Sequence, residues 1–224
     1  MRHSRYKYFS SLDYANQFID GKMFHQTAAY FRDYEDKEAQ QIIGDEYEGT
    51  RLYRPANGLE IHNLTSGTNS NLQMGMECLT KAHEIYVFCV SLSYNDLLKQ
   101  EFNAAACVEI CDPRKFIYRW LERLPAEAKR DDRHVARRVA YYRPEDLPGN
   151  VWELPDLITT TKLKRFAYQD EYRFAYTITD AFAFQNCTYP LVDRTARPLP
   201  KKEEHHHNTL ELGDLRDICM LHKF

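Results

Sequence analysis

The most regular pattern of hydrophobic and polar positions in the chain lies at Phe166–Tyr176, FAYQDEYRFAY. Successive side chains of a β-strand point to opposite faces of the sheet. The pattern therefore predicts one continuous strand with a polar face of Gln169, Glu171 and Arg173 between two alanines. Gln169 and Glu171 would lie side by side, about 7 Å apart along the strand. The opposite face would be mainly aromatic and would carry Phe166, Tyr168, Asp170, Tyr172, Phe174 and Tyr176.

Other strands are predicted where apolar or alternating runs are bounded by turn residues. The strongest of these is Glu84–Tyr94, whose alternation puts Cys89, Ser91 and Ser93 on one face. Further strands are expected at Arg5–Ser10, Lys22–Thr27, Arg51–Tyr53, Leu59–Leu64, Cys107–Cys111, Val135–Tyr142, Thr159–Phe166, Leu210–Leu215 and Ile218–Leu221.

Helices are predicted where apolar residues recur at helical spacing after a capping residue. They are expected at Ser11–Ile19, Ala28–Glu38, Met76–His83, Asn95–Ala106 and Arg114–Leu124. Strands and helices mix without a regular βαβ alternation, which favours an α+β fold with a mostly antiparallel, split sheet and flanking helices. We expect a single domain over residues 1–224, with a linker-like stretch at Leu64–Gly75 and an exposed loop at 196–208.

Composition narrows the class of protein. A hydrophobic content of 43% and a charged content of 28% are enough to build a sizeable core. The six cysteines form no C-x-x-C pair, the N-terminus is polar, and no apolar run approaches the roughly 18 residues of a membrane span. We therefore expect a soluble cytoplasmic protein with free thiols. The net charge of -3 provides no bulk attraction to nucleic acid.

Three predicted strands carry polar groups that could share one pocket. An early strand carries Lys7 and Tyr8, with Arg5 as a rival cation, and the central strand carries Ser91 and Ser93. The late strand carries Gln169 and Glu171. The order along the chain is thus a cation, then S-x-S, then Q-x-E.

This order resembles the arginine–serine–glutamate pattern of the ADP-ribosyltransferase fold. The resemblance implies that Lys7 and Tyr8 contact NAD, that Ser91 and Ser93 support the nicotinamide pocket, and that Glu171 is catalytic with Gln169 beside it. Arg54 and Arg173 are further cofactor-binding candidates, and Leu52-Tyr53-Arg54 is a rival for the first motif. Lys7 stands where the family has arginine or histidine, and Leu92 stands where it has threonine.

The resemblance implies an NAD-dependent mono-ADP-ribosyltransferase, with NAD as substrate and a protein or a nucleic acid as acceptor. It also suggests a bacterial or phage toxin, effector or defence protein. The chain is similar as well to uncharacterised small bacterial proteins with a Y-K-Y strand and an F-x-D-x-E segment, here Phe31–Glu35. A carboxylate at Glu171 would stabilise an oxocarbenium-like transition state, and Gln169 would orient the acceptor.

Two other classes of function stay open. One is a non-catalytic binding module of a toxin–antitoxin or defence system, with an apolar patch around Trp152 and Tyr189 for an antitoxin or other partner. The other is a metal-dependent nuclease that uses two acidic clusters, Asp33, Glu35 and Asp36 with Asp45, Glu46 and Glu48.

Other polar runs are weaker candidates. The basic run Lys129–Arg138, followed by Tyr141 and Tyr142, could touch phosphate and stack bases, although a solvated surface explains it better. His205–His207 and the Cys107/Cys111 pair are not expected to bind metal, because no matching ligand spacing completes a site.

Overall fold

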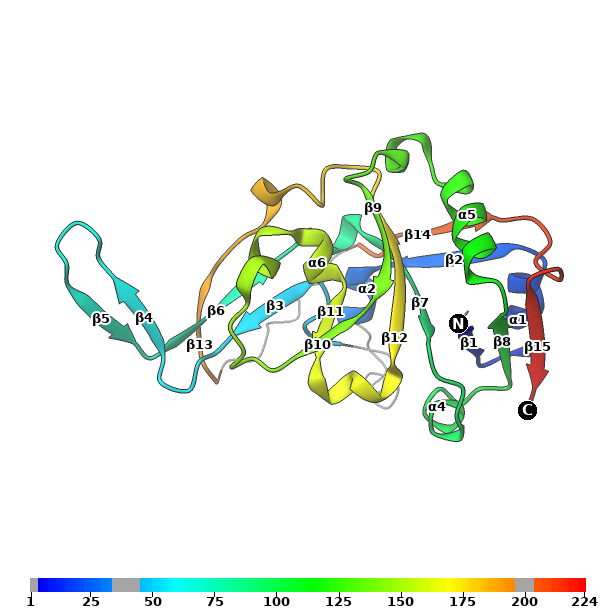
Figure 1. The fold of residues 1–224 in the computed structure, drawn as a ribbon, viewed down its shortest axis with the longest axis horizontal. Coiled ribbons are helices and arrows are strands. Elements are labelled where there is room, and N and C mark those ends of the chain that lie inside the picture. Colours follow the sequence, from blue (N-terminus) through cyan, green and yellow to red (C-terminus); the bar gives the residue numbers. More distant parts are fainter. Residues whose placement is uncertain (1–3, 34–44, 196–203) are drawn as a thin grey trace.

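The computed structural model describes residues 4–33, 45–195 and 204–224, and the structural statements below concern these residues. Its main element is an eight-stranded sheet in which every pairing is antiparallel. The path β14-β2-β7-β1-β8-β15 is joined at β7 by β12, which in turn pairs with β9 (Figure 1). The strands are β1 (Arg5–Phe9), β2 (Lys22–Thr27), β7 (Tyr86–Ser91), β8 (Ala106–Ile110), β9 (His134–Arg138), β12 (Glu171–Tyr176), β14 (His207–Glu211) and β15 (Cys219–Lys223).

The remaining strands form smaller sheets. β13 (Leu191–Asp193), β6 (Met74–Leu79) and β3 (Thr50–Tyr53) make a three-stranded antiparallel sheet, and β4 (Leu59–His62) pairs with β5 (Asn69–Leu72) in a hairpin. β10 (Ala140–Tyr142) and β11 (Thr161–Leu163) form a parallel pair. The predicted α+β class with mostly antiparallel sheets is therefore confirmed.

Helices are short and few. They are α1 (Leu12–Ile19), α2 (Ala28–Arg32), α4 (Asp96–Glu101), α5 (Pro113–Arg123) and α6 (Pro155–Thr159), with 3-10 turns η1 (Ala82–Glu84), η2 (Ala126–Lys129), η3 (Gly149–Glu153), η4 (Lys164–Gln169) and η5 (Phe184–Asn186). Side-chain caps begin three of the helices, because Ser11, Asn95 and Asp112 each accept a backbone N–H of the first turn.

The main core lies on the aromatic face of β12. Phe174 packs edge-on against Phe116 and Trp120 of α5, with ring centroids 5.3 Å away in both pairs. Phe18 of α1 stacks on Phe88 of β7 at 5.4 Å. The predicted alternation is therefore confirmed from residue 171 onward, where one face of the strand enters this core and the other faces away from it.

The prediction of one continuous strand over Phe166–Tyr176 is wrong. Residues Lys164–Gln169 form the 3-10 turn η4, and Asp170 adopts a left-handed conformation with φ of 42° before β12 begins at Glu171. Asp is one of the few residue types other than glycine that adopt this conformation readily. It accepts hydrogen bonds from Ser93 Oγ at 2.8 Å and Arg138 Nη2 at 2.6 Å. These partners are distant in sequence, and alternation alone does not reveal them.

Several other boundaries differ from the sequence expectations. Met76–His83 is not a helix, because its first residues belong to β6 and pair with β3 and β13. Val135–Tyr142 divides at Val139 into β9 and β10, which belong to different sheets. In the expected exposed loop 196–208, His207 and Asn208 instead belong to β14, whereas 196–203 lies outside the described residues. The strand predicted at Leu210–Leu215 corresponds to the end of β14, which stops at Glu211.

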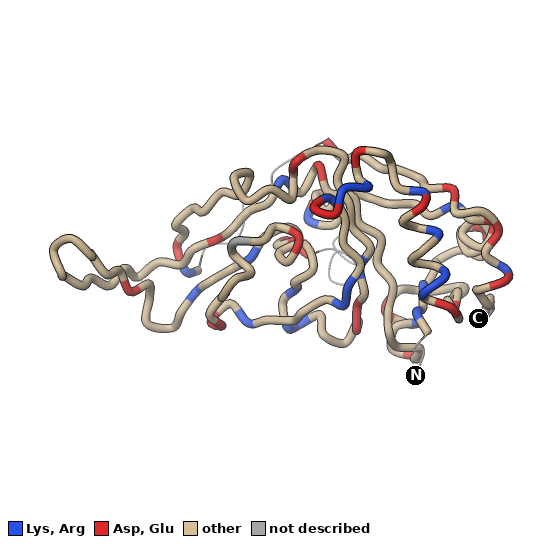
Figure 2. Tube along the Cα trace, turned by 45° about the horizontal axis from the view of Figure 1, so that its top comes forward, with Lys and Arg blue, Asp and Glu red and all other residues tan. Residues whose placement is uncertain are grey.

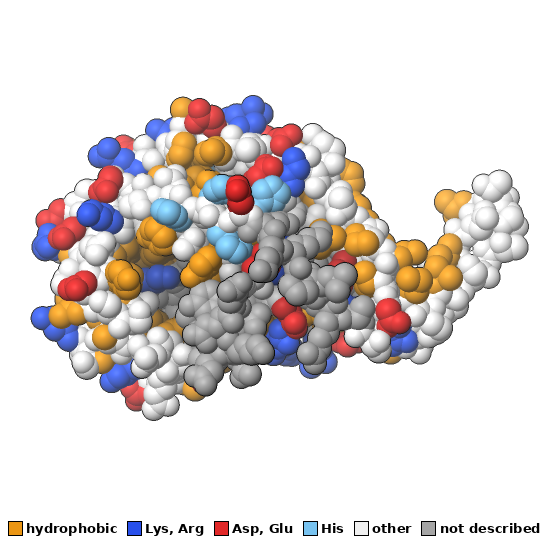
Figure 3. All heavy atoms as spheres, turned by 180° about the vertical axis from the view of Figure 1, so that it is seen from behind, with side chains coloured by type: hydrophobic (Ala, Val, Ile, Leu, Met, Phe, Trp, Pro, Cys, Tyr) orange, Lys and Arg blue, Asp and Glu red, His pale blue; other side chains and the backbone are white. Residues whose placement is uncertain are grey.

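The linker-like stretch Leu64–Gly75 contributes to a projecting hairpin arm, β4–β5, which stands clear of the body (Figures 1 and 3). Glu60 is the one Asp, Glu, Lys or Arg residue of its strands and tip, and Figure 2 shows how little charge the arm carries compared with the body. Among the described residues, no helix is both long enough and apolar enough to span a membrane.

A histidine inside the main sheet predicts a pH dependence of stability. His25 on β2 is fully buried beside the Tyr176 ring, and burial lowers its pKa from 6.5 to about 3. Below pH 6.5 the unfolded chain takes up a proton that the folded protein cannot accommodate, so stability falls by about 1.4 kcal/mol per pH unit from this group. This loss continues until the pH approaches about 3.

The test compares the free energy of unfolding in urea between pH 4 and pH 8 for the wild type and His25→Phe. The comparison is needed because burial raises the pKa of Asp45 to about 6, which acts in the opposite direction over part of this range. The difference between the two proteins should shrink as the pH falls. A constant difference would contradict the assignment of His25.

Candidate active site

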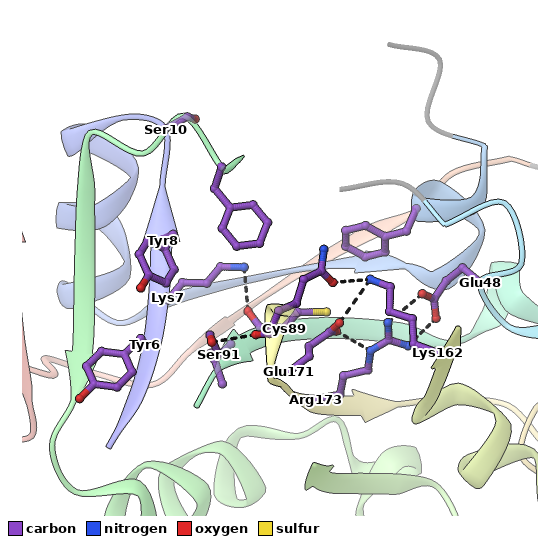
Figure 4. A pocket seen from close by; sticks show the side chains of 14 residues that line it. Tyr6, Lys7, Tyr8, Ser10, Glu48, Cys89, Ser91, Lys162, Glu171 and Arg173 are labelled. Carbon is purple, nitrogen blue, oxygen red and sulfur yellow. Dashed lines mark hydrogen bonds and ion pairs between the residues drawn. The ribbon is translucent and has the colours of Figure 1, made fainter. Parts of the chain in front are cut away.

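A pocket opens where β1, β7 and β12 lie side by side (Figure 4). Ser91 is the point at which they meet, since it pairs with Tyr6 of β1 on one side and with Glu171 of β12 on the other. The cavity has a volume of about 210 Å³. Its lining includes Lys7, Tyr8, Ser91, Gln169, Glu171 and Arg173, which are six of the eight residues singled out from the sequence.

The pocket lies where the large sheet divides. β1 pairs with β7 at Ser91, and β2 pairs with β7 at Val87 and Tyr86. Between these attachments, β7 has no strand partner on that side among the residues described. The Cys89 carbonyl is satisfied instead by the Lys7 ammonium, whose Nζ donates to it at 2.9 Å. A lysine side chain thus replaces a strand partner and forms one wall of the pocket.

The floor of the pocket is a buried network of charges. The Arg173 guanidinium donates from Nε to Glu171 Oε1 at 2.6 Å and forms a two-pronged ion pair with the Glu48 carboxylate. Lys162 Nζ donates to Glu171 Oε2 at 3.3 Å and to Gln169 Oε1 at 2.8 Å. Since Glu171 is only 4% exposed, its charge is balanced by these two cations rather than by water.

The network fixes the protonation state of Glu171. Burial acts to raise the pKa of this carboxyl, but the positive charges of Arg173 and Lys162 outweigh it and hold the pKa far below its ordinary value. Burial acts to lower the pKa of Lys162, and the Glu171 carboxylate more than reverses this. The site therefore presents an ionised carboxylate over the whole ordinary range of pH.

The opposite wall is mainly apolar, and its polar residues include Lys7 and Ser10. Lys7 Nζ lies 4.6 Å from the centre of the Phe88 ring, and burial lowers its pKa against the opposing pull of Cys89 and Glu171. Tyr8 contributes its ring to the lining, because its hydroxyl donates to Ser93 O at 3.1 Å and accepts from Asn95 N at 3.0 Å. Burial raises the pKa of Tyr8 to about 12, so this hydroxyl stays protonated.

The two serines stabilise the turn that precedes β12. Ser91 Oγ donates to the backbone carbonyl of Gln169 at 2.8 Å and accepts from Ser93 N at 3.0 Å. Ser93 Oγ donates to the carboxylate of Asp170, and Ser93 does not line the pocket. The pair therefore holds the turn that presents Gln169 and Glu171. Ser91 therefore lines the pocket and Ser93 lies beside it, and both hydroxyls are engaged in hydrogen bonds within the protein.

The rival cations lie elsewhere. Arg54 directly follows β3, donates to Glu77 Oε1 at 2.8 Å and does not line the pocket. Arg5 lies over the Tyr172 ring at 4.4 Å and is likewise not a lining residue. Of the three proposed first-strand cations, Lys7 is the one that the fold brings to Glu171. Arg173 does reach the site, but two carboxylates engage its guanidinium, so it positions Glu171.

Sequence reasoning missed Lys162, and it assigned Glu48 only to an acidic cluster of the nuclease alternative. Lys162 lies on β11 and Glu48 precedes β3, and both line the pocket. Glu48 belongs to a run of acids that resembles a solvated turn, and Lys162 is followed by Lys164 and Arg165 in a short basic stretch of the same kind. Neither position carries a local pattern that marks it, because each becomes functional through a partner from another part of the chain.

The acidic clusters are used for other purposes. Glu48 binds Arg173, and Glu46 pairs with Arg165 at 3.3 Å. Asp33 pairs with Arg32, whereas Glu35 and Asp36 lie outside the described residues. Within the described part of the chain, no group of three or more His, Cys, Asp or Glu residues is arranged to hold a metal ion. Asp33, Glu46 and Glu48 are thus each engaged in an ion pair.

The basic run and its tyrosines are also engaged. Arg137 pairs with Asp156 and Arg138 with Asp170, at 2.8 Å and 2.6 Å. Tyr141 accepts a hydrogen bond from Glu171 N at 2.8 Å, and Tyr142 accepts one from Leu52 N at 3.1 Å. The hydroxyls of the two tyrosines therefore stabilise the site and the β3 region, and the Tyr142 ring is buried.

The expected apolar patch is present in altered form. Trp152 is 7% exposed and stacks under Tyr189, with ring centroids 5.9 Å apart. The exposed part is formed by Phe184, which is 53% exposed, and Leu191, which is 49% exposed, together with Tyr189.

In comparisons with known proteins, no family model matches this chain, and no match is found among curated proteins or solved structures.

The charge network predicts a large loss of stability when one member is removed. Arg173→Met would leave the carboxylates of Glu48 and Glu171 buried with fewer cations, which costs about 3–5 kcal/mol in comparable cases. Urea unfolding followed by circular dichroism measures this loss. The control is Arg216→Met, whose pair with Asp20 is exposed and contributes little. Equal effects of the two substitutions would contradict the assignment.

Proposed function

We propose that this protein cleaves the nicotinamide–ribose bond of NAD and transfers ADP-ribose to a macromolecular acceptor. The observation that carries the proposal is the convergence of three sequence motifs on neighbouring strands. Lys7 from β1, the Ser91 strand and Glu171 of β12 meet at one pocket, although they lie far apart in the sequence. This is the convergence that the resemblance to ADP-ribosyltransferases requires of them.

The chemistry of Glu171 suits a cationic transition state. A carboxylate offers about four acceptor positions. Arg173 Nε, Lys162 Nζ and the Cys89 thiol donate to Glu171, which leaves one position for a ribose hydroxyl. A fixed negative charge that hydrogen-bonds this hydroxyl stabilises an oxocarbenium-like state more than the ground state.

The alternative of thiol catalysis at the same site is disfavoured. Burial raises the pKa of the Cys89 thiol, and the Glu171 carboxylate raises it further. The pKa of Glu171 is itself held low, so this carboxylate is a poor base for the thiol proton. An electrostatic role for Glu171 fits both pKa shifts, whereas a proton-transfer role fits neither.

Other lining residues match the remaining parts of NAD. Lys7 supplies a positive charge for the diphosphate, and the rings of Tyr6, Tyr8, Phe31 and Phe102 supply apolar walls for nicotinamide. The cavity of about 210 Å³ is smaller than the roughly 300–1,000 Å³ that takes a drug-sized ligand whole. The nicotinamide end would enter the pocket, and the adenosine end would lie beyond it. Gln169 would face the acceptor, either protein or nucleic acid, in a bacterial or phage toxin, effector or defence protein.

The direct test is incubation of the protein with NAD labelled in its ADP-ribose part, together with total bacterial lysate. We expect nicotinamide release, measured by chromatography, and a labelled protein or nucleic-acid fraction. Glu171→Gln should lower the rate of release by about 10²–10³-fold, as removal of one preorganised group typically does. The control is Glu211→Gln on the exposed side of β14, which should retain full activity.

Two results would overturn this proposal. One is an absence of nicotinamide release and labelling by the wild type, and the other is full activity of a folded Glu171→Gln protein. Melting temperatures of each variant separate lost chemistry from lost structure.

A second prediction concerns binding. Lys7→Met removes a charge-assisted contact to the diphosphate and should weaken NAD binding by roughly 10–100-fold. Binding of nicotinamide alone, which has no phosphate, should change little. Isothermal titration measures both, with the exposed Lys22→Met as control. Equal weakening for both ligands would show that Lys7 acts on the fold of the pocket rather than on the diphosphate.

We also propose a second candidate, a non-catalytic module that binds an antitoxin or another partner protein. The exposed set of Phe184, Tyr189 and Leu191 supports it, because large apolar side chains that gather on a surface often mark an interface. This candidate predicts no NAD binding, so the titration above separates the two functions.

A further inference from the structure

Two cysteines outside the pocket are brought together by a pairing of distant segments. Cys78 lies on β6, and Cys187 directly follows the turn η5. Leu79 and Thr188 form an antiparallel bridge between these segments, with backbone hydrogen bonds of 2.9 Å and 3.1 Å. The bridge fixes the register, so each cysteine lies one residue before a paired residue.

The register places both thiols on one face. In an antiparallel pair with Leu79 opposite Thr188, Cys78 lies opposite Tyr189, and Cys187 is its diagonal neighbour on the same face. Diagonal neighbours lie about 7–8 Å apart at the backbone, with side chains that can reach one another. A disulfide usually spans Cα atoms about 4.4–6.8 Å apart, so closing the bond requires a small shift of the segment that follows η5. Here Cys187 packs against the buried cluster of Cys78, Trp152 and Ile158, and each thiol shifts the pKa of the other.

The surroundings of the pair make the two thiols unequal. Cys78 is fully buried, and its thiol also donates to Trp152 O at 3.9 Å. Cys187 is partly exposed, so a solute can reach it. The neighbouring Cys78 thiol lowers the pKa of Cys187, while Cys187 and burial raise the pKa of Cys78. A thiolate is the reactive form of cysteine, so Cys187 is the thiol that an oxidant would meet first.

We propose that Cys78 and Cys187 form a modification site that a hydroperoxide converts into a disulfide. The Cys187 thiolate attacks the peroxide oxygen, the O–O bond breaks, and a sulfenic acid forms with release of water or an alcohol. The Cys78 sulfur then attacks the Cys187 sulfur, and the S–O bond breaks with loss of a second water. Two thiols are oxidised by two electrons, and one peroxide is reduced.

The disulfide would fasten the segment Cys187–Asp193 to β6 by a covalent bond in addition to the existing strand pairing. It would close a loop of more than 100 residues, and the typical stabilisation by such a bond corresponds to a rise in melting temperature of roughly 5–15 °C. The inference does not depend on NAD chemistry, since neither cysteine lines the pocket.

The other four cysteines serve as internal references. Cys107 is buried, and Cys89 lines the pocket with a raised pKa. Cys111 is exposed at the end of β8, and Cys219 begins the neighbouring strand β15. Burial raises the pKa of both Cys111 and Cys219. Cys111 and Cys219 therefore test whether two cysteines on neighbouring strands, one of them exposed, are oxidised to a disulfide without further features.

The experiment treats the full chain with about one equivalent of hydrogen peroxide, alkylates the free thiols in denaturant and maps the peptides by mass spectrometry. We expect loss of two of the six titratable thiols and a Cys78–Cys187 linked peptide. Reduction with dithiothreitol should reverse both changes. Cys187→Ser should abolish the link and the rise in melting temperature, whereas Cys111→Ser should leave both unchanged.

A second variant keeps the test decisive if substitution of one cysteine disturbs the fold. Cys78→Ala retains Cys187, so peroxide should leave a sulfenic acid there that dimedone labels. The proposal is overturned if the wild type accumulates sulfinic acid at Cys187 without a linked peptide, or if the link joins Cys111 to Cys219 instead. It is also overturned if Cys78→Ala remains unlabelled by dimedone while Cys187 stays a free thiol.

Discussion

The Arg173 guanidinium, buried between the carboxylates of Glu48 and Glu171, is the contact on which the site depends. Ions removed from water are stabilised only when opposite charges and hydrogen bonds replace the lost hydration. Lys162 completes the balance, so that two cations face two carboxylates with nearly all their polar atoms engaged. This cluster also joins the large sheet to the segment before β3. The local structure and the charge of the pocket floor are therefore maintained by the same contacts.

That balance restricts the chemistry available to Glu171. A carboxylate whose pKa is held low by neighbouring cations is a poor proton acceptor and a persistent negative charge. It can act on a substrate by electrostatic attraction and by accepting a hydrogen bond. Proton abstraction from Cys89 or another weak acid would require a carboxyl group in a different environment. The proposed stabilisation of a cationic sugar uses the property that the fold maintains.

The division of the sheet at β7 explains why the pocket lies where it does. β1 and β2 pair with opposite ends of β7, and the backbone of β7 between these two pairings needs other hydrogen-bond donors. Lys7 supplies one to the Cys89 carbonyl, which brings an ammonium group into an otherwise aromatic wall. Ser91, Ser93 and Asp170 then hold the turn before β12 from the other side. Polar groups that complete the hydrogen bonding of the backbone thus also shape the pocket.

The sequence by itself was sufficient for the features that depend on local pattern. Alternation over Glu171–Tyr176 correctly separated the aromatic face from the polar face, because burial of one face of a strand imposes a period of two residues. The mixture of predicted strands and helices also indicated the α+β class. The order of the motifs along the chain grouped Lys7, Ser91, Gln169 and Glu171 as candidates for one site. Alternation misjudged how Gln169 reaches the site, since the residues before Glu171 form a turn rather than a strand.

Only the tertiary structure decided which charges meet. Glu48 and Arg173 are 125 positions apart, and the hydrogen bonds that shape the turn at Asp170 come from Ser93 and Arg138. Arg54 and Arg5 were rivals of Lys7 in the sequence, and the pairing of strands brings Lys7 rather than the other two to the pocket. The physical reason is that an ion pair needs two groups within a few ångströms, and this distance is set by the packing of whole elements. The spacing of residues along the sequence does not reveal this distance.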